Sequence, residues 1–180
     1  MNGFVPWERK NEFKRSFAIV MGQKNQLWWD LPASDSLYLN KCIYDVDDRE
    51  YKKTVDELSE LLGVRELMNI QVRRLSLGER MKMEILAALI HRPGILFLDE
   101  PTIGLDIVSQ QKIRDFLHYY NEQTKTTVIL TSHYMRDIEA LCSRAVIINS
   151  GTLVYDGALS DINHRMGDKR LLTHLLFPAR

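Results

Sequence analysis

Two adjacent carboxylates, Asp99 and Glu100, stand where chemistry on a phosphate could take place. They follow the apolar run Ile95–Leu98, which predicts a strand buried on both faces of a parallel sheet. Pro101 cannot continue a central strand, so the acids are expected at its carboxyl end, where open α/β sheets bind ligands. One acid could hold Mg²⁺ through water while the other orients or deprotonates a water that attacks a phosphoryl group. A charged turn is the plainer interpretation of an isolated pair.

Two further polar residues follow apolar strands. His133 comes after the strand expected at Thr126–Thr131, and Gln23 comes after the strand expected at Phe17–Met21. Taken singly, each side chain is more often structural than catalytic. Because parallel strands bring their carboxyl ends to one edge, however, Gln23, Asp99, Glu100 and His133 could converge on one Mg-nucleotide.

A helix begins after Leu75 and runs to about His91. Ser76 and Glu79 are spaced as a capping box, in which each side chain bonds the other residue's backbone amide. The amides and dipole of a helix N-terminus favour an anion.

The remaining pattern gives a plan for the chain. A short helical stretch begins near Glu8, and the segments from Ser34 to Gly63, Ser109 to Glu122 and Met135 to Leu141 are helical. Apolar stretches at 144–149 and 151–155 form a strand pair. We therefore expect one domain, with a helical lobe at about 33–92, core strands at about 17–22 and 94–157, and a tail at 158–180.

Composition restricts the class of protein. Lys plus Arg number 24 and Asp plus Glu number 24, so the balanced charge argues against a nucleic-acid partner bound by phosphate neutralisation. Cys42 and Cys142 have no metal-ligand spacing and are interpreted as buried, reduced thiols of a cytosolic protein. No run is long enough for a transmembrane helix, and the first residues do not look like a signal peptide.

The ordered motifs Leu75–Glu79, Ile95–Thr102, Gly104–Asp106 and Thr131–His133 resemble those of the ATP-binding subunit of ABC transporters. The segment Gly22–Pro32 is similar to a subgroup that serves ABC-2-type permeases, many of them exporters. The resemblance implies an α/β fold: a partial P-loop NTPase-like ABC ATPase domain with a mostly parallel sheet core and a helical lobe. It also implies ATP and Mg²⁺ as ligands, and a peripheral location on the cytoplasmic face of the cell membrane.

The resemblance also assigns roles at the nucleotide. Asp99 would hold Mg²⁺ through water, Glu100 would polarise the attacking water, and His133 would contact the γ-phosphate. Gln23 would sense Mg²⁺ and move with the permease. Trp28 and Trp29 would either contact the permease or merely pack the lobe.

Other roles concern a second ATPase subunit, paired head to tail with the first. Ser76 and Gly78 belong to the signature loop, which touches the γ-phosphate of ATP held by the opposite subunit. Asp106 lies in the loop that crosses the interface. Leu77 and Glu79 depart from the usual signature, and Glu79 brings a negative charge near the triphosphate unless it turns back into the cap.

The phosphate-binding loop is the larger departure. None of the nine glycines is followed by Lys, so no Gly-x-x-x-x-Gly-Lys-Ser/Thr motif occurs, and the aromatic residue that stacks on adenine is missing too. We expect an N-terminally truncated subunit with negligible ATPase activity alone, and apolar sheet faces left exposed.

Two alternatives remain at this point. The chain could be a non-catalytic partner that regulates a complete ABC ATPase, although the retained Asp99, Glu100 and His133 weigh against this. It could also be a soluble ABC ATPase of translation or DNA repair, against which the balanced charge and the tryptophan loop argue.

Overall fold

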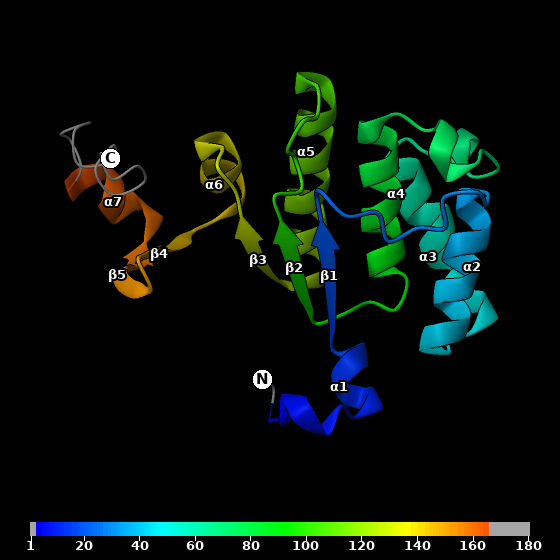
Figure 1. The fold of residues 1–180 in the computed structure, drawn as a ribbon, viewed down its shortest axis with the longest axis horizontal. Helices are drawn as coiled ribbons and strands as arrows, with labels where there is room; N and C mark the ends of the chain where they lie inside the picture. Colours follow the sequence, from blue (N-terminus) through cyan, green and yellow to red (C-terminus); the bar gives the residue numbers. More distant parts are fainter. Residues whose placement is uncertain (1–2, 166–180) are drawn as a thin grey trace. The chain divides into compact units, whose positions relative to one another are not determined.

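The computed structural model describes residues 3–165, and the chain divides into two compact units, residues 1–133 and 134–180. The first unit is built on a parallel sheet of β1 (Phe17–Met21), β2 (Ile95–Asp99) and β3 (Thr127–Thr131), in that order (Figure 1). The register aligns Met21, Asp99 and Thr131 at one end of the sheet. The three predicted strands and their parallel arrangement are therefore confirmed.

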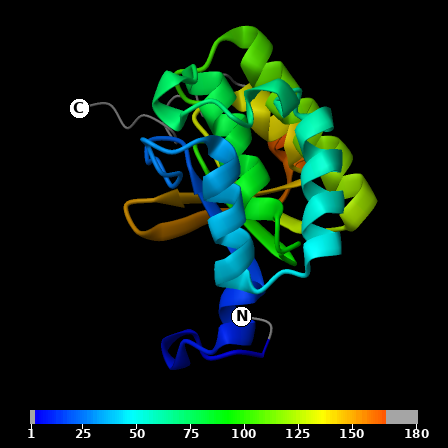
Figure 2. The same cartoon turned by 90° about the vertical axis from the view of Figure 1, so that its right-hand side faces the viewer.

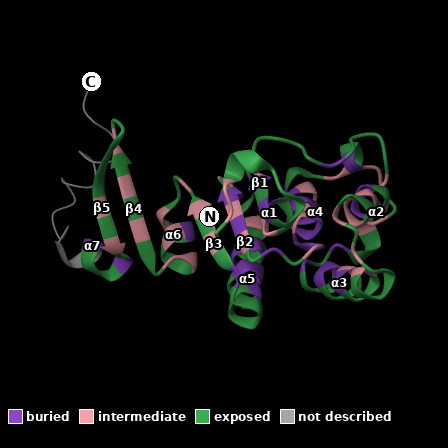
Figure 3. Ribbon diagram, turned by 90° about the horizontal axis from the view of Figure 1, so that it is seen from below, coloured by how far each residue is buried: buried purple, intermediate pink, exposed green. Residues whose placement is uncertain are grey.

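The sheet is covered on one face. Helix α4 (Leu77–Leu89) packs against β1 and against α5 (Ile107–Thr124), which runs behind the strands in Figure 1. In the views from the side and from below, α5 lies along one face of the strands with α4 beside it, and buried residues are found on α4, α5 and β2 (Figures 2 and 3). The side chains that point into this layer are apolar and buried: Ala18, Val20, Leu96 and Leu98.

The opposite face of the sheet is more exposed than the sequence predicts. Ile19 and Ile129 are 38% and 47% exposed there, and Ile95 and Phe97 are only partly buried. The prediction that Ile95–Leu98 is buried on both faces is therefore wrong, because the described elements of this unit cover one side of β2 only. Apolar content indicated a central strand correctly but could not show whether both layers were present.

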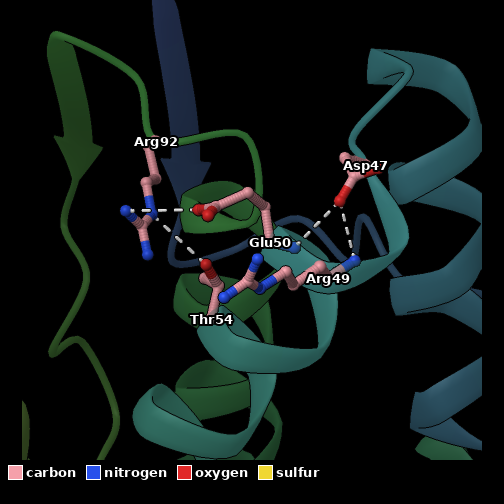
Figure 4. A network of polar contacts seen from close by, with 5 residues as sticks. All are labelled: Asp47, Arg49, Glu50, Thr54 and Arg92. Atoms are coloured by element: carbon pink, nitrogen blue, oxygen red, sulfur yellow. Dashed lines mark hydrogen bonds and ion pairs between the residues drawn. The ribbon is translucent and has the colours of Figure 1, made fainter.

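The helical lobe consists of α2 (Ala33–Tyr44), α3 (Asp48–Leu61) and the short 3₁₀ turns η2 (Arg65–Leu67) and η3 (Val72–Arg74). The Asp47 carboxylate caps α3 by accepting from the amides of Arg49 and Glu50 (Figure 4). Arg92, in the loop before β2, donates from Nε to Thr54 Oγ1 at 3.2 Å and lies 3.5 Å from Glu50. These contacts fasten the lobe to the loop that enters the central strand.

The N-terminal segment differs slightly from the single predicted stretch. It forms a 3₁₀ turn, η1 (Pro6–Glu8), and a short helix, α1 (Asn11–Arg15). Arg9 separates them in a left-handed conformation, with φ of 51°. Phe13 contacts the rings of Phe4 and Phe17, so the segment is joined to the start of β1.

The second unit contains α6 (Met135–Leu141), β4 (Arg144–Asn149), β5 (Thr152–Ala158) and α7 (Leu159–Arg165). The strands form a separate antiparallel pair around Ser150 and Gly151, both with positive φ. The predicted strand pair is confirmed, but it does not extend the parallel sheet. The predicted tail is helical over Leu159–Arg165, and its remainder lies outside the described residues.

Candidate functional site

The carboxyl end of β2 presents Asp99 beside a hydroxyl of β3. Thr131 Oγ1 donates a hydrogen bond to Asp99 Oδ1 at 2.6 Å, which the in-step register of the two strands makes possible. The distance is typical of a strong hydrogen bond to a carboxylate. Asp99 is exposed, so its carboxylate is oriented by Thr131 and remains accessible. Thr131 lies within a predicted motif, but the sequence does not indicate a role for its side chain.

Glu100 is held by His133. The imidazole Nε2 lies 3.2 Å from Glu100 Oε1, and the backbone amide of His133 donates to Oε2 at 3.2 Å. The Glu100 side chain is 13% exposed whereas that of His133 is 75% exposed. Glu100 also has a positive φ of 51°, an unusual conformation for this residue that is often found at functional sites. The structure thus brings together the two residues predicted to be catalytic.

Gly22 determines how closely the first loop approaches these acids. Its amide donates to the Asp99 carbonyl at 2.8 Å, and a β-carbon on Gly22 would collide with the Glu100 carbonyl oxygen. Only glycine permits this approach without a shift of the backbone. Sequence reasoning missed this role, although a glycine directly after a strand is the signal that could have suggested it.

Gln23 follows Gly22 and is exposed. Within the part of the chain that the structure describes, no hydrogen bond joins its side chain to Asp99, Glu100 or His133. The structure therefore places Gln23 at the predicted edge of the sheet, next to Gly22, without a hydrogen bond to the acids among the described residues.

The two neighbouring tryptophans are presented on the surface. Trp28 is 56% exposed and Trp29 is 47% exposed. The guanidinium of Arg80, on α4, lies 5.4 Å from the centre of a Trp29 ring, within the range of a cation–π contact. Trp29 is thus partly packed against the lobe while both rings keep accessible surface.

The predicted capping box at the start of α4 is present. Ser76 Oγ accepts from the Glu79 amide at 3.3 Å, and Glu79 Oε2 accepts from the Ser76 amide at 2.8 Å. The Ser76 hydroxyl also donates to Glu79 Oε2 at 2.8 Å, and the two bonds that this carboxylate accepts, from the Ser76 amide first and then from the hydroxyl, lower its pKa below the ordinary value. The Glu79 charge is therefore turned back into the cap.

Gly78 packs against the start of α5. A β-carbon there would collide with the Ser109 side chain, and Gly78 is buried. Ser109 is held by Asp106, whose carboxylate accepts from the Ser109 amide at 2.9 Å and from its hydroxyl at 2.6 Å. These bonds, the one from the hydroxyl first, lower the pKa of Asp106. Sequence reasoning also missed Ser109, because Gly78, the residue that it packs against, lies on another helix.

The predicted residues therefore form two clusters within the first unit. One contains Asp99, Glu100 and His133, and the other contains Ser76, Gly78 and Asp106. In the described residues no hydrogen bond or ion pair joins one cluster to the other.

Neither cluster forms a complete metal-binding site from protein side chains alone. Among residues 3–165, no group of three or more His, Cys, Asp and Glu side chains is arranged to hold a metal ion. An accessible aspartate without such a cage suits Mg²⁺, which keeps much of its water and is usually completed by substrate phosphates. The donor set fits a magnesium–nucleotide complex better than a free cation.

Comparison with known proteins gives a consistent result. The family described as "ABC transporter" matches residues 5–103. The "ABC transporter ATP-binding protein NatA" of Bacillus subtilis (strain 168) is 34% identical over 162 residues, which cover 90% of this chain and 65% of that protein. The "Linearmycin resistance ATP-binding protein LnrL" of the same organism is 33% identical over 172 residues, covering 96% of this chain and 55% of that protein.

Solved structures agree in fold. One described as "Structure of ATP binding subunit of ABC transporter" superposes with a TM-score of 0.79 at 25% identity, covering 93% of this chain and 69% of that one. The α/β fold expected from the sequence is thereby confirmed. The chain spans less than two thirds of the length of the two curated relatives. Among the described residues, no helix has both the length and the apolar character needed to cross a membrane.

Proposed function

Because the chain belongs to the ABC transporter family, we propose that it is an ATP-binding subunit that works with a membrane permease. The printed names of its relatives, an ABC transporter ATP-binding protein and a linearmycin resistance ATP-binding protein, support this role. The resistance protein favours an exporter of the ABC-2 type. We place the subunit on the cytoplasmic face of the membrane, with Trp28 and Trp29 as the surface offered to the permease.

The observation that carries the proposal is the geometry at the carboxyl end of β2. Asp99 is oriented by Thr131 Oγ1 at 2.6 Å, and Glu100 is held against His133 at 3.2 Å. Two neighbouring carboxylates are thus fixed by different partners and can perform different tasks. Asp99 would hold Mg²⁺ through water, and Glu100 would accept a hydrogen bond from the water that attacks the γ-phosphate. Bound Mg²⁺ would supply charge neutralisation at the phosphates.

The second cluster serves a different nucleotide in this proposal. Ser76 and Gly78 stand at the N-terminus of a 13-residue helix, where amides and the dipole favour a phosphate. Their separation from Asp99 and Glu100 supports a head-to-tail pair of subunits, in which Ser76 and Gly78 of this chain would complete an ATP site of the other subunit. Gly78 is fitted against Ser109, so the loop of Asp106 would move with the signature.

No Gly-x-x-x-x-Gly-Lys-Ser/Thr motif occurs within these 180 residues, and we propose that Ser76 and Gly78 serve ATP held by the phosphate loop of another subunit. Ser76 and Gly78 would reach that ATP across the interface. Without loop amides and a lysine to bind phosphates, the chain alone would show negligible turnover.

The test is ATPase activity in a mixture. The chain is combined with a family subunit that carries the phosphate loop but lacks the serine of its own signature. We expect activity above that of either protein alone, and a loss of about tenfold or more for Ser76→Ala in this chain. Asp47→Ala is the matched control, since it removes a helix cap of similar energy away from the site. An unchanged rate with Ser76→Ala would contradict the proposal.

A regulatory partner without catalytic work of its own is the second candidate, favoured by the missing phosphate loop. Glu100→Gln distinguishes the two roles in a membrane-embedded complex containing this chain. A subunit whose own acids act in hydrolysis would lose activity with Glu100→Gln. A regulator that contributes only Ser76 and Gly78 would keep it.

A further inference from the structure

We propose that Glu84 is a positioning residue that clamps the loop of residues 22–31 to the signature helix α4. This inference deepens the proposed function and rests on it, because the loop carries Gln23, Trp28 and Trp29. Its structural part can nevertheless be tested without nucleotide or permease.

The Glu84 side chain is buried and accepts hydrogen bonds from the loop. Glu84 is 4% exposed, and its Oε1 accepts hydrogen bonds from the amides of Gln26 at 2.8 Å and Leu27 at 3.3 Å. These donors lie 58 and 57 residues earlier in the chain, so the contact joins two separate motifs. A buried carboxylate requires such partners, because its desolvation is otherwise uncompensated.

A second contact lies one turn earlier on the same helix. Arg80 and Glu84 are four residues apart and therefore share a face of α4. Arg80 lies over Trp29 while Glu84 holds Gln26 and Leu27. Helix α4 thus contacts both the backbone of the loop and one of the loop's tryptophan side chains.

Other anchors of the loop lie further along it. Ser36 Oγ accepts from the Trp28 amide at 3.0 Å, and the carbonyls of Trp29 and Leu31 accept from Arg73 and Val72. These contacts tie the distal half of the loop to α2 and η3. Glu84, on α4, contacts the half of the loop that is nearer to Gln23.

The functional consequence follows from the place of α4 in the chain. Its first turn contains Gly78, two residues after the cap residue Ser76, and its fourth and eighth residues, Arg80 and Glu84, contact the loop. A displacement of the loop by a partner at the tryptophans would therefore be transmitted to the signature through one helix. Glu84 supplies the charged hydrogen-bond acceptor of this connection.

Hydrogen exchange of the purified chain tests the clamp. In Glu84→Ala the Gln26 and Leu27 amides lose their acceptor, and we expect their exchange to accelerate about 10- to 100-fold. Glu84→Gln keeps a carbonyl acceptor without the charge, so it should restore part of the protection. Glu79→Ala is the matched control, because it disrupts the same helix at its cap but leaves Glu84 in place.

The outcomes are distinguishable. Unchanged exchange at Gln26 and Leu27 in Glu84→Ala would overturn the proposal, as would an equal acceleration at Leu96 and Leu98 in the core. If the alanine variant does not fold, Glu84→Gln decides alone: protection between that of wild type and of free amides supports the clamp, and wild-type protection overturns the need for charge. Failure here leaves the ATPase proposal standing, and failure of the mixed ATPase assay leaves the clamp standing.

Discussion

Glu79 and Glu84 lie five residues apart on α4 but experience opposite environments. Hydrogen bonds from Ser76 lower the pKa of Glu79, whereas burial raises the pKa of Glu84 despite the two amides that bond it. Glu79 is therefore stabilised as a carboxylate that caps the helix. Burial disfavours the ionised form of Glu84, and the loop amides partly offset this cost.

The two residues should affect stability in opposite directions as the pH changes. The contribution of Glu79 is present above its ordinary pKa of 4.5 and is lost as pH falls through its lowered folded-state value. The contribution of Glu84 is present below 4.5 and is lost as pH rises through its raised folded-state value. Urea unfolding from acidic to neutral pH measures both.

In that experiment Glu79→Gln should be most destabilising near neutral pH. Glu84→Gln should instead become less destabilising relative to wild type as pH rises, because it removes a charge that is costly to bury. The same pH trend in both variants would show that the two environments have been misassigned.

At the scale of the elements, the loop after β1 packs tightly against the loop after β2, where Gly22 lies against the backbone of Glu100. Gly22→Ala should destabilise the chain by about 1–3 kcal/mol, because its β-carbon collides with the Glu100 carbonyl. Gly94→Ala is the control, since the nearest atom to its added β-carbon is 3.7 Å away. Denaturant unfolding compares the two, and equal effects would mean that the Gly22 approach is not restrictive.

Several elements could be predicted because their determinants are local. The apolar strands, the Ser76 capping box and the turn at Ser150 and Gly151 each lie within a few residues. The partial exposure of Phe97 could not be predicted, because it depends on which layers meet the sheet. The contact of Thr131 with Asp99 and the contact of Ser109 with Gly78 could not be predicted either. The two residues of each pair are 32 and 31 positions apart, and strand register and helix packing bring them together.

At the scale of the whole molecule, we propose that the chain holds the residues for two different halves of an ATP site. Asp99, Glu100 and His133 meet at the end of the sheet, and Ser76, Gly78 and Asp106 meet where α4 and α5 begin. The motifs named both groups of residues, whose roles at a nucleotide remain predictions. Their separation within one unit follows from the fold and supports a pair of subunits.

The most direct test of this account is Mg-ATP binding by the purified chain, followed with a fluorescent ATP analogue for wild type and Glu100→Gln. The account predicts no saturable binding below about 1 mM for either protein, because Asp99 and Glu100 lack loop amides to hold the phosphates. Submillimolar binding would contradict it and would show that another segment of this chain cradles the nucleotide.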